Sequence, residues 1–130
     1  MKKESGLAED ALPCAPSRWK LLKAKLNNLG PRSFMEAIGK AEKPIIIDVR
    51  TPEEFNEWHI PNAVNISYLS ENFWETIESL DKDYTFFICC QSTRRSIRTC
   101  TLMRNGGFDP EKIFNLEGGI SEWKEIFNTK

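Results

Sequence analysis

A cysteine that precedes a short polar loop and a pair of arginines is the part of this sequence best suited to chemistry. The apolar run 86–88 leads into Cys89 and Cys90, and three polar residues separate Cys90 from Arg94 and Arg95. A helix N-terminus and nearby guanidinium groups both stabilise a thiolate. In an open α/β sheet, ligands bind at the carboxyl ends of the strands. The pattern therefore predicts a thiolate nucleophile that acts on, or carries, a small anion.

The elements that must position this loop alternate along the chain. Apolar and β-branched runs predict five strands, over residues 25–29, 44–49, 63–66, 85–89 and 113–116. Apolar residues at helical spacing predict helices over residues 33–40, 52–58, 95–105 and 120–127, and a further helix capped by Ser70. Strands that alternate with helices indicate a parallel sheet covered on both faces, so the expected fold class is α/β.

Local signals mark several helix ends and turns. Thr51 is expected to be an N-cap, Pro52 the first helical residue, and Glu54 the partner in a capping box. The pair 106–107 is expected to end the preceding helix through a left-handed glycine. The pair 118–119 is expected to form a tight turn that only glycine permits.

Length and composition suit one domain that carries a core. The chain has 130 residues, of which 40% are hydrophobic, and a formal net charge of −1. We expect residues 1–24 to be a flexible leader that contains an incidental thiol, Cys14, and residues 25–130 to be the folded domain. A near-neutral charge gives no reason to expect nucleic acid as a partner. No apolar run has the length of a membrane span, so no membrane partner is expected either.

The number and spacing of the cysteines indicate the redox environment of the protein and whether a metal site is expected. The chain has four cysteines, two of them adjacent, which is not a disulfide framework. It has no CxxC motif and only one histidine, His59, so the sequence does not predict a zinc site. Reduced thiols in a cytoplasm are the expected state, with no metal and no cofactor.

Four sequence blocks in series resemble the rhodanese-like sulfurtransferases over roughly residues 26–127. They are the segments 47–50 with 52–55, 59–61 with 63–65, 90–96, and 107–108 followed by 116–120 and Trp123. The resemblance implies a three-layer α/β/α domain with a five-stranded parallel sheet. It also implies that the active cysteine starts the loop after the fourth strand.

Two positions depart from the family pattern. Asn62 stands where members often have glycine, and asparagine tolerates left-handed geometry better than most residues. Thr93 stands where the active loop commonly has glycine, and a β-branched residue resists positive φ. Either this loop closes with right-handed dihedral angles or its activity is weakened.

Two cysteines compete for the role of nucleophile. Cys90 and Arg95 enclose four residues, the sulfurtransferase spacing, whereas Cys89 and Arg95 match the C-x5-R pattern of cysteine phosphatases and arsenate reductases. Ile88 occupies the place where a phosphatase usually has histidine, and the loop lacks the glycines on which phosphatase loops rely. We therefore favour Cys90, with Cys89 as a small buried hydrophobe and Cys100 in the core.

The predicted function is transfer of a sulfane sulfur from an anionic donor, thiosulfate or a persulfide, to a thiol or cyanide through a Cys90 persulfide. The alternatives are a phosphatase or arsenate reductase that uses Cys89, and a non-catalytic interaction module. A protein that donates or accepts sulfur is compatible with the same site. Asp48 and Arg50 either orient the loop or form a plain structural ion pair. The loop residues expected to bind the donor or the persulfide are Gln91, Ser92, Thr93, Arg94, Arg95 and Ser96.

Overall fold

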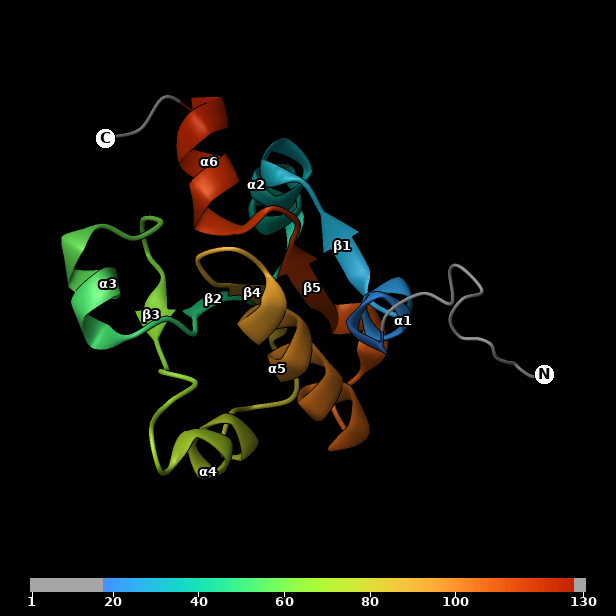
Figure 1. The fold of residues 1–130 in the computed structure, drawn as a ribbon. Coiled ribbons are helices and arrows are strands. Elements are labelled where there is room, and N and C mark those ends of the chain that lie inside the picture. The colour runs from blue at the N-terminus through green and yellow to red at the C-terminus, as the bar shows by residue number, and fades with distance from the viewer. Residues whose placement is uncertain (1–17, 128–130) are drawn as a thin grey trace, which may run out of the picture.

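Five parallel strands form one sheet at the centre of the molecule (Figure 1). The computed structural model describes residues 18–127. The strand order is β1-β5-β4-β2-β3, so β4 lies in the middle. The strands are β1 (Asn27–Leu29), β2 (Pro44–Asp48), β3 (Val64–Asn65), β4 (Thr85–Cys89) and β5 (Ile113–Leu116). The α/β fold class and the five-stranded parallel sheet predicted from the sequence are confirmed.

Helices cover both faces of the sheet and make three layers. The helices are α1 (Arg18–Ala24), α2 (Pro31–Lys40), α3 (Pro52–Glu57), α4 (Phe73–Glu78), α5 (Arg94–Asn105) and α6 (Gly119–Phe127). A short 3₁₀ helix, η1 (Pro110–Lys112), precedes β5. The sequence predicted neither α1 nor η1.

Helix α1 occupies part of the segment predicted as a flexible leader. A helix of seven residues is marginal alone, and α1 packs against α5, which is distant in sequence. Its Lys23 carbonyl also accepts a hydrogen bond from the side chain of Asn28. The rest of the predicted leader, residues 1–17 with Cys14, lies outside the described residues.

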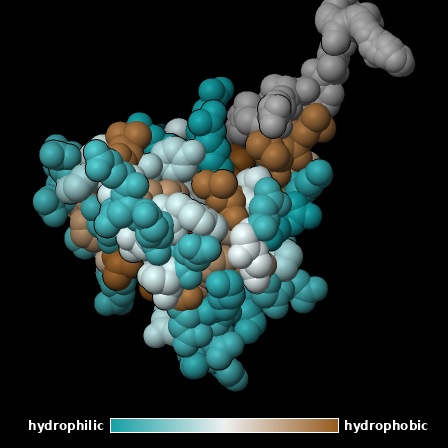
Figure 2. Space-filling model, turned by 90° about the horizontal axis from the view of Figure 1, so that it is seen from below, coloured by the Kyte–Doolittle hydropathy of each residue, from teal (hydrophilic) through white to brown (hydrophobic). Residues whose placement is uncertain are grey.

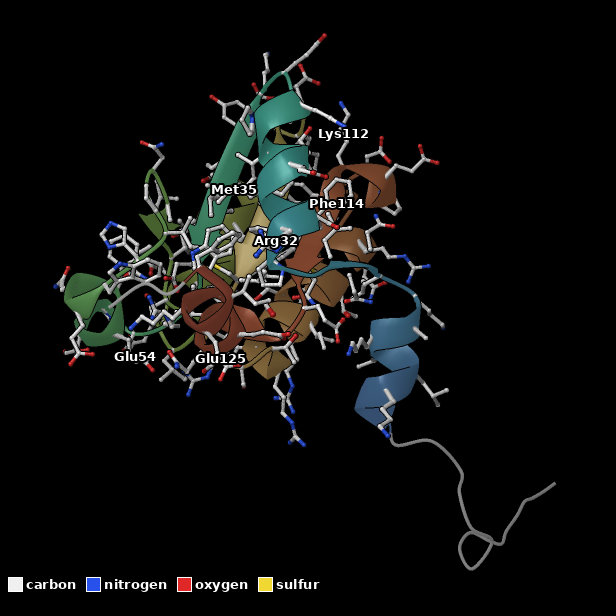
Figure 3. All side chains as sticks on the ribbon, turned by 90° about the horizontal axis from the view of Figure 1, so that it is seen from above. Arg32, Met35, Glu54, Lys112, Phe114 and Glu125 are labelled. Atoms are coloured by element: carbon white, nitrogen blue, oxygen red, sulfur yellow. The ribbon has the colours of Figure 1, made fainter. Side chains whose placement is uncertain are left out.

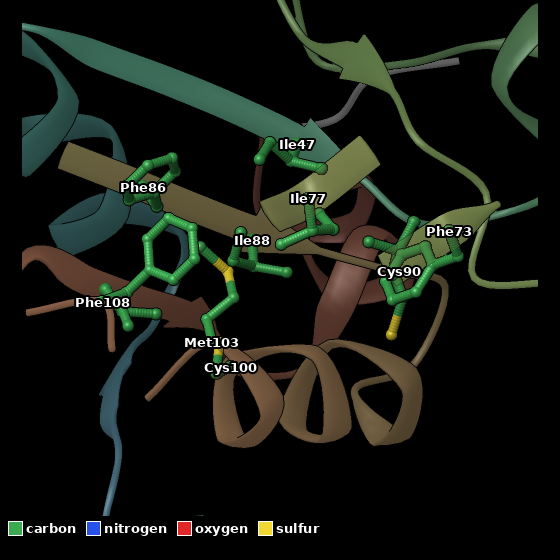
Figure 4. Close-up of a cluster of buried hydrophobic side chains, with 11 residues drawn as sticks. Ile47, Phe73, Ile77, Phe86, Ile88, Cys90, Cys100, Met103 and Phe108 are labelled. Carbon is green, nitrogen blue, oxygen red and sulfur yellow. The ribbon is translucent and has the colours of Figure 1, made fainter. Parts of the chain in front are cut away.

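Alternation along β4 divides the core into two clusters. Phe86 and Ile88 face one cluster, which α4 and α5 cover with Ile77, Cys100 and Met103 (Figure 4). Phe87 and Cys89 face the other cluster, where they meet α2 and α6. That second cluster is formed by Phe34, Ile46, Ile60, Phe87, Cys89, Leu116, Ile120 and Trp123. The two adjacent cysteines therefore belong to opposite sides of the sheet.

Most predicted local signals are present, and one is wrong. Asn62 has φ of +74° and thus adopts the left-handed conformation expected of it. Gly107 (φ +98°) follows α5 as a left-handed residue, as predicted. Ser70 is not a helix cap: α4 begins at Phe73, after Asn72, and no side chain caps it. Ser70 instead donates its hydroxyl to the side chain of Asn72.

The surface shown in Figure 2 is largely hydrophilic, with hydrophobic side chains in small separate areas. Leu69 (63% exposed) and Leu21 (53% exposed) are the most exposed large hydrophobic side chains that the structure describes. Among the described helices, none has the length and apolarity needed to cross a bilayer.

The capping box predicted at the start of α3 is present. The Thr51 hydroxyl accepts a bond from Glu54 N at 3.2 Å, and the Glu54 carboxylate accepts one from Thr51 N at 3.1 Å. The Thr51 backbone N–H is the main cause that lowers the pKa of Glu54 from its ordinary 4.5, against a smaller opposing effect of burial. Glu54, labelled on α3 in Figure 3, is thus charged at neutral pH.

We expect Glu54→Gln to lower the free energy of unfolding at pH 7 by roughly 0.5–1 kcal/mol, because an amide serves the cap and the helix dipole less well. A depressed folded-state pKa stabilises the fold above pH 4.5, and this stabilisation is lost as pH falls through the lower folded value. The deficit of the variant should therefore shrink below pH 4.5 in urea unfolding curves. Glu53→Gln, at the exposed neighbouring position, is the control. A pH-independent deficit would contradict this assignment.

Candidate active site

Cys90 lies directly after β4, at the carboxyl edge of the sheet. Its side chain is 2% exposed and borders the first core cluster. Its Sγ accepts a hydrogen bond from the backbone N–H of Ser96 at 3.3 Å. Figure 4 shows the sulfur directed toward the first turn of α5, the positive end of that helix dipole. This position suits a sulfur atom that carries negative charge.

A small cavity opens over this sulfur. Its volume is about 200 Å³, below the usual range of ligand pockets, so it suits a small molecule. Arg94 and Arg95 line it and their positive charges favour an anion, while Glu54 contributes one negative charge. The cavity is lined by Glu54, Cys90, Gln91, Ser92, Arg94 and Arg95. Four of the six predicted loop residues thus line the cavity together with Cys90. Ser96 contacts the sulfur without lining the cavity, and Thr93 contacts Ser96.

The other two described cysteines are buried more deeply. Cys89 is 0% exposed, and burial, with the negative charge of Asp48 next, raises its pKa well above the ordinary value. Cys100 is also 0% exposed, and burial raises its pKa as well. Neither sulfur lines the cavity. The geometry therefore favours Cys90 over Cys89 as the reactive thiol.

The loop needs no glycine to reach its shape. Thr93 has φ of 170°, which is extended backbone that any residue adopts. Among the described residues, Asn62 is the only non-glycine with positive φ. The loop therefore closes without left-handed backbone, so Thr93 in place of glycine does not prevent its closure.

Asp48 and Arg50 form a buried ion pair that reaches the loop. Arg50 Nη2 and Nε donate to the Asp48 carboxylate at 2.7 and 2.9 Å. Arg50 Nη1 donates to Gln91 Oε1 at 3.2 Å, which connects the end of β2 to the active loop. Burial acts to lower the pKa of Arg50, but hydrogen bonding and the charge of Asp48 outweigh it and raise the pKa. Asp48 and Arg50 can therefore form a structural ion pair and orient the loop at the same time.

The N-terminus of α6 holds the other side of the loop. The backbone N–H of Ile120 donates to Cys90 O at 2.9 Å, and that of Ser121 to Gln91 O at 3.2 Å. The Gln91 amide in turn donates to Ser121 Oγ at 2.9 Å. Gln91 thus connects Arg50 to α6. Ser121 is not among the site residues predicted from the sequence, because only its position after the 118–119 pair places it near the loop.

Gly119 lies directly against the loop backbone. It has φ of +68°, and a Cβ there would lie 2.4 Å from Ser92 O and 2.5 Å from Gln91 O. We expect Gly119→Ala to lower the free energy of unfolding by about 1–3 kcal/mol, because positive φ and the clash both oppose it. Gly39→Ala is the control, since a Cβ at this helical position meets nothing within 4 Å and should stabilise by up to about 1 kcal/mol. Equal effects in thermal unfolding would contradict the contact.

Metal binding finds no support in the described part of the chain. No group of three or more His, Cys, Asp or Glu side chains there is arranged to hold a metal ion. His59 uses Nδ1 in a contact of 2.8 Å with Phe55 O and stacks on the Phe55 ring. Its surroundings are those of a structural residue.

Comparison with known proteins assigns the chain to a family. The chain matches the rhodanese-like domain over residues 31–126, and it belongs to that family. YtwF of Bacillus subtilis, provisionally named a sulfurtransferase, is 34% identical over 100 residues, which cover 77% of this chain and 92% of that protein. The chloroplast protein of Arabidopsis thaliana named thiosulfate sulfurtransferase 16 is 33% identical over 87 residues, which cover 59% of this chain and 71% of that protein.

Solved structures agree with the sequence matches. The crystal structure of a rhodanese-like domain protein from Staphylococcus aureus has a TM-score of 0.64 to this chain and 26% sequence identity. The match covers 75% of this chain and 91% of that one. The resemblance stated from the sequence is therefore confirmed, for both the family and the fold.

Proposed function

We propose that this protein is a sulfurtransferase that carries a sulfane sulfur as a persulfide on Cys90. The observation that carries the proposal is the place of Cys90 Sγ, at the start of α5 and on the wall of a small cavity bordered by Arg94 and Arg95. Family membership and the names of relatives support rhodanese-type sulfur transfer in general. The cavity supports the finer claim of a small anionic donor.

The proposed reaction has two covalent steps. The Cys90 thiol loses its proton to solvent, and the thiolate attacks the outer sulfur of thiosulfate. A new S–S bond forms on Cys90 while the S–S bond of the donor breaks, and sulfite leaves with the electron pair. Cyanide in an assay, or a thiolate in a cell, then attacks the outer sulfur, and Cys90 leaves as the thiolate. The two steps balance without an external oxidant or reductant.

Each loop residue has a proposed role in this cycle. Arg94 and Arg95 attract the anionic donor and stabilise the outer sulfur, which carries the negative charge of the persulfide. The N–H of Ser96 donates to the inner sulfur. Gln91, held by Arg50 and α6, keeps the cavity wall in place. Thiosulfate is the donor we propose to test first, and a protein persulfide or thiol is a further proposed donor or acceptor.

One observation weighs against each alternative. A phosphatase or arsenate reductase would need the sulfur of Cys89, which is fully buried on the other side of the sheet. An interaction module was favoured by the missing loop glycine, and Thr93 needs none. We also propose a reducing, cytoplasmic location, which the free state of the three described cysteines supports.

A paired turnover assay tests the proposed function. The full-length protein is assayed for thiocyanate formation from thiosulfate and cyanide, and in parallel for hydrolysis of an aryl phosphate. We expect saturable thiocyanate formation with ping-pong kinetics and no aryl phosphate hydrolysis. Aryl phosphate hydrolysis alone would establish the phosphatase, and no turnover of any donor, including glutathione persulfide, would leave the interaction module.

A further inference from the structure

Four polar side chains form a continuous chain of hydrogen bonds from Cys90 to the edge strand β1. Cys90 Sγ lies 3.5 Å from Ser96 Oγ, and Ser96 Oγ lies 2.5 Å from Asn115 Oδ1. Asn115 Nδ2 donates to Asn28 Oδ1 at 2.9 Å. Ser96 and Asn115 are 0% exposed, so water cannot replace these partners. Two asparagines on neighbouring strands thus contact the active cysteine through one hydroxyl.

Backbone carbonyls set the direction of every bond in this relay of Asn28, Asn115 and Ser96. The Asn28 amide nitrogen lies 2.9 Å from Lys23 O and 3.2 Å from Leu26 O, and both carbonyls only accept. Asn28 must therefore present its oxygen to Asn115. Asn115 in turn must present its nitrogen to Asn28 and its oxygen to Ser96.

The direction of the relay decides what Cys90 receives from Ser96. The hydroxyl has a single proton, and its two oxygen neighbours besides the sulfur are acceptors, Asn115 Oδ1 and Thr93 O at 2.8 Å. The proton is committed to one of them, so Ser96 Oγ presents a lone pair to the sulfur. A lone pair favours a sulfur that bears a proton or a second sulfur, and opposes a bare thiolate.

We propose that Asn28 and Asn115 are positioning residues that hold the Ser96 hydroxyl as an acceptor toward Cys90. Their effect opposes that of the Ser96 N–H and the α5 dipole on the same sulfur: it favours the thiol or the loaded persulfide over the bare thiolate. The part that concerns the persulfide rests on the proposed function. Asn28 precedes residues 31–126, the part that matches the family, so the relay makes the α1–β1 segment part of the site.

Alkylation of Cys90 by iodoacetamide tests the relay without any sulfur donor. Without Asn28, the amide nitrogen of Asn115 keeps only the Thr93 hydroxyl, at 3.2 Å, and a hydroxyl can donate as well as accept. Asn115 can then turn its amide, which leaves Thr93 O as the one oxygen that competes with the thiolate for the Ser96 proton. We expect Asn28→Ala to raise the alkylation rate of Cys90 at pH 7 about fivefold, the value of one ordinary hydrogen bond. The label is quantified on the Cys90 peptide by mass spectrometry. Asn28→Ser, a smaller change, should raise it in the same direction.

Two controls separate the relay from simple loosening of the fold. Asn27→Ala removes a neighbouring amide that also donates to two backbone carbonyls, those of Pro110 and Ile113, but has no bond to the relay. It should leave the alkylation rate unchanged. In a Ser96→Ala background, Asn28→Ala should have no further effect, because the hydroxyl that transmits it is absent.

Three results would overturn the proposal: no increase in Asn28→Ala, an equal increase in Asn27→Ala, or the same increase without Ser96. The lifetime of the Cys90 persulfide after thiosulfate treatment should also be shorter in Asn28→Ala than in wild type. Absence of any persulfide in wild type would refute the proposed function, whereas the alkylation rates would still decide the relay.

Discussion

Cys90→Ser is expected to reduce thiosulfate-to-cyanide turnover by at least about a thousandfold, because a serine hydroxyl cannot form the persulfide that both half-reactions share. Serine preserves the size of the side chain and its place beside the N–H of Ser96, so the fold should be retained. The measurement is steady-state thiocyanate formation, with circular dichroism and thermal unfolding to verify the fold. Little loss of turnover in a folded Cys90→Ser protein would contradict the role of Cys90.

Cys89→Ser is the matched control for this prediction. It changes the adjacent sulfur, which is fully buried between the sheet and the helices of the second cluster. A buried hydroxyl costs stability, so turnover is compared per folded molecule. We expect it to stay within about threefold of wild type, since no step uses this sulfur. A collapse of turnover in Cys89→Ser together with normal turnover in Cys90→Ser would reverse the assignment.

Asp48→Ala is expected to lower the free energy of unfolding by about 3–5 kcal/mol, because it leaves the Arg50 guanidinium buried without its counter-charge. Asp48 is 0% exposed and Arg50 is 3% exposed, so water compensates little. The Asp48 carboxylate also accepts the backbone N–H of Arg50 at 3.0 Å, and this bond is lost as well. Urea unfolding monitored by tryptophan fluorescence measures the change.

Asp83→Ala serves as the control for Asp48→Ala. Asp83 is exposed in the loop before β4, and its replacement should change the unfolding free energy by less than about 0.5 kcal/mol. A loss at position 48 as small as that at position 83 would mean that the buried pair contributes no more than a surface charge. If Asp48→Ala also releases the bond from Arg50 Nη1 to Gln91 Oε1, thiocyanate formation per folded molecule should fall as well.

Elements with strong local signals were predicted within a residue or two. β2, β4 and β5 are short, mostly apolar segments, and their observed bounds agree closely with the prediction. The capping box of Thr51 and Glu54 is equally local, and it is present. α1 was missed because its seven residues are stabilised by packing against α5 and by Asn28, which no periodicity reveals.

Within the candidate site, too, residues close to Cys90 in sequence could be predicted and distant ones could not. The segment from Cys90 to Ser96 could be predicted because the residues that surround the sulfur follow it directly in the chain. Asn115 could not be predicted, because a polar residue within a strand is expected to face solvent. Its partners Ser96 and Asn28 lie far away in sequence. Glu54 was predicted only as a cap, and its second position on the cavity wall depends on how α3 meets the loop.

Mass spectrometry of the protein after brief thiosulfate treatment determines whether Cys90 carries the transferred sulfur. We expect the added mass of one sulfur atom, located on the peptide that contains Cys90 and removed by cyanide. The same treatment of Cys90→Ser should add nothing. A folded wild-type protein that gains no sulfur from thiosulfate or from glutathione persulfide, or that gains it on Cys89, would refute the Cys90 persulfide.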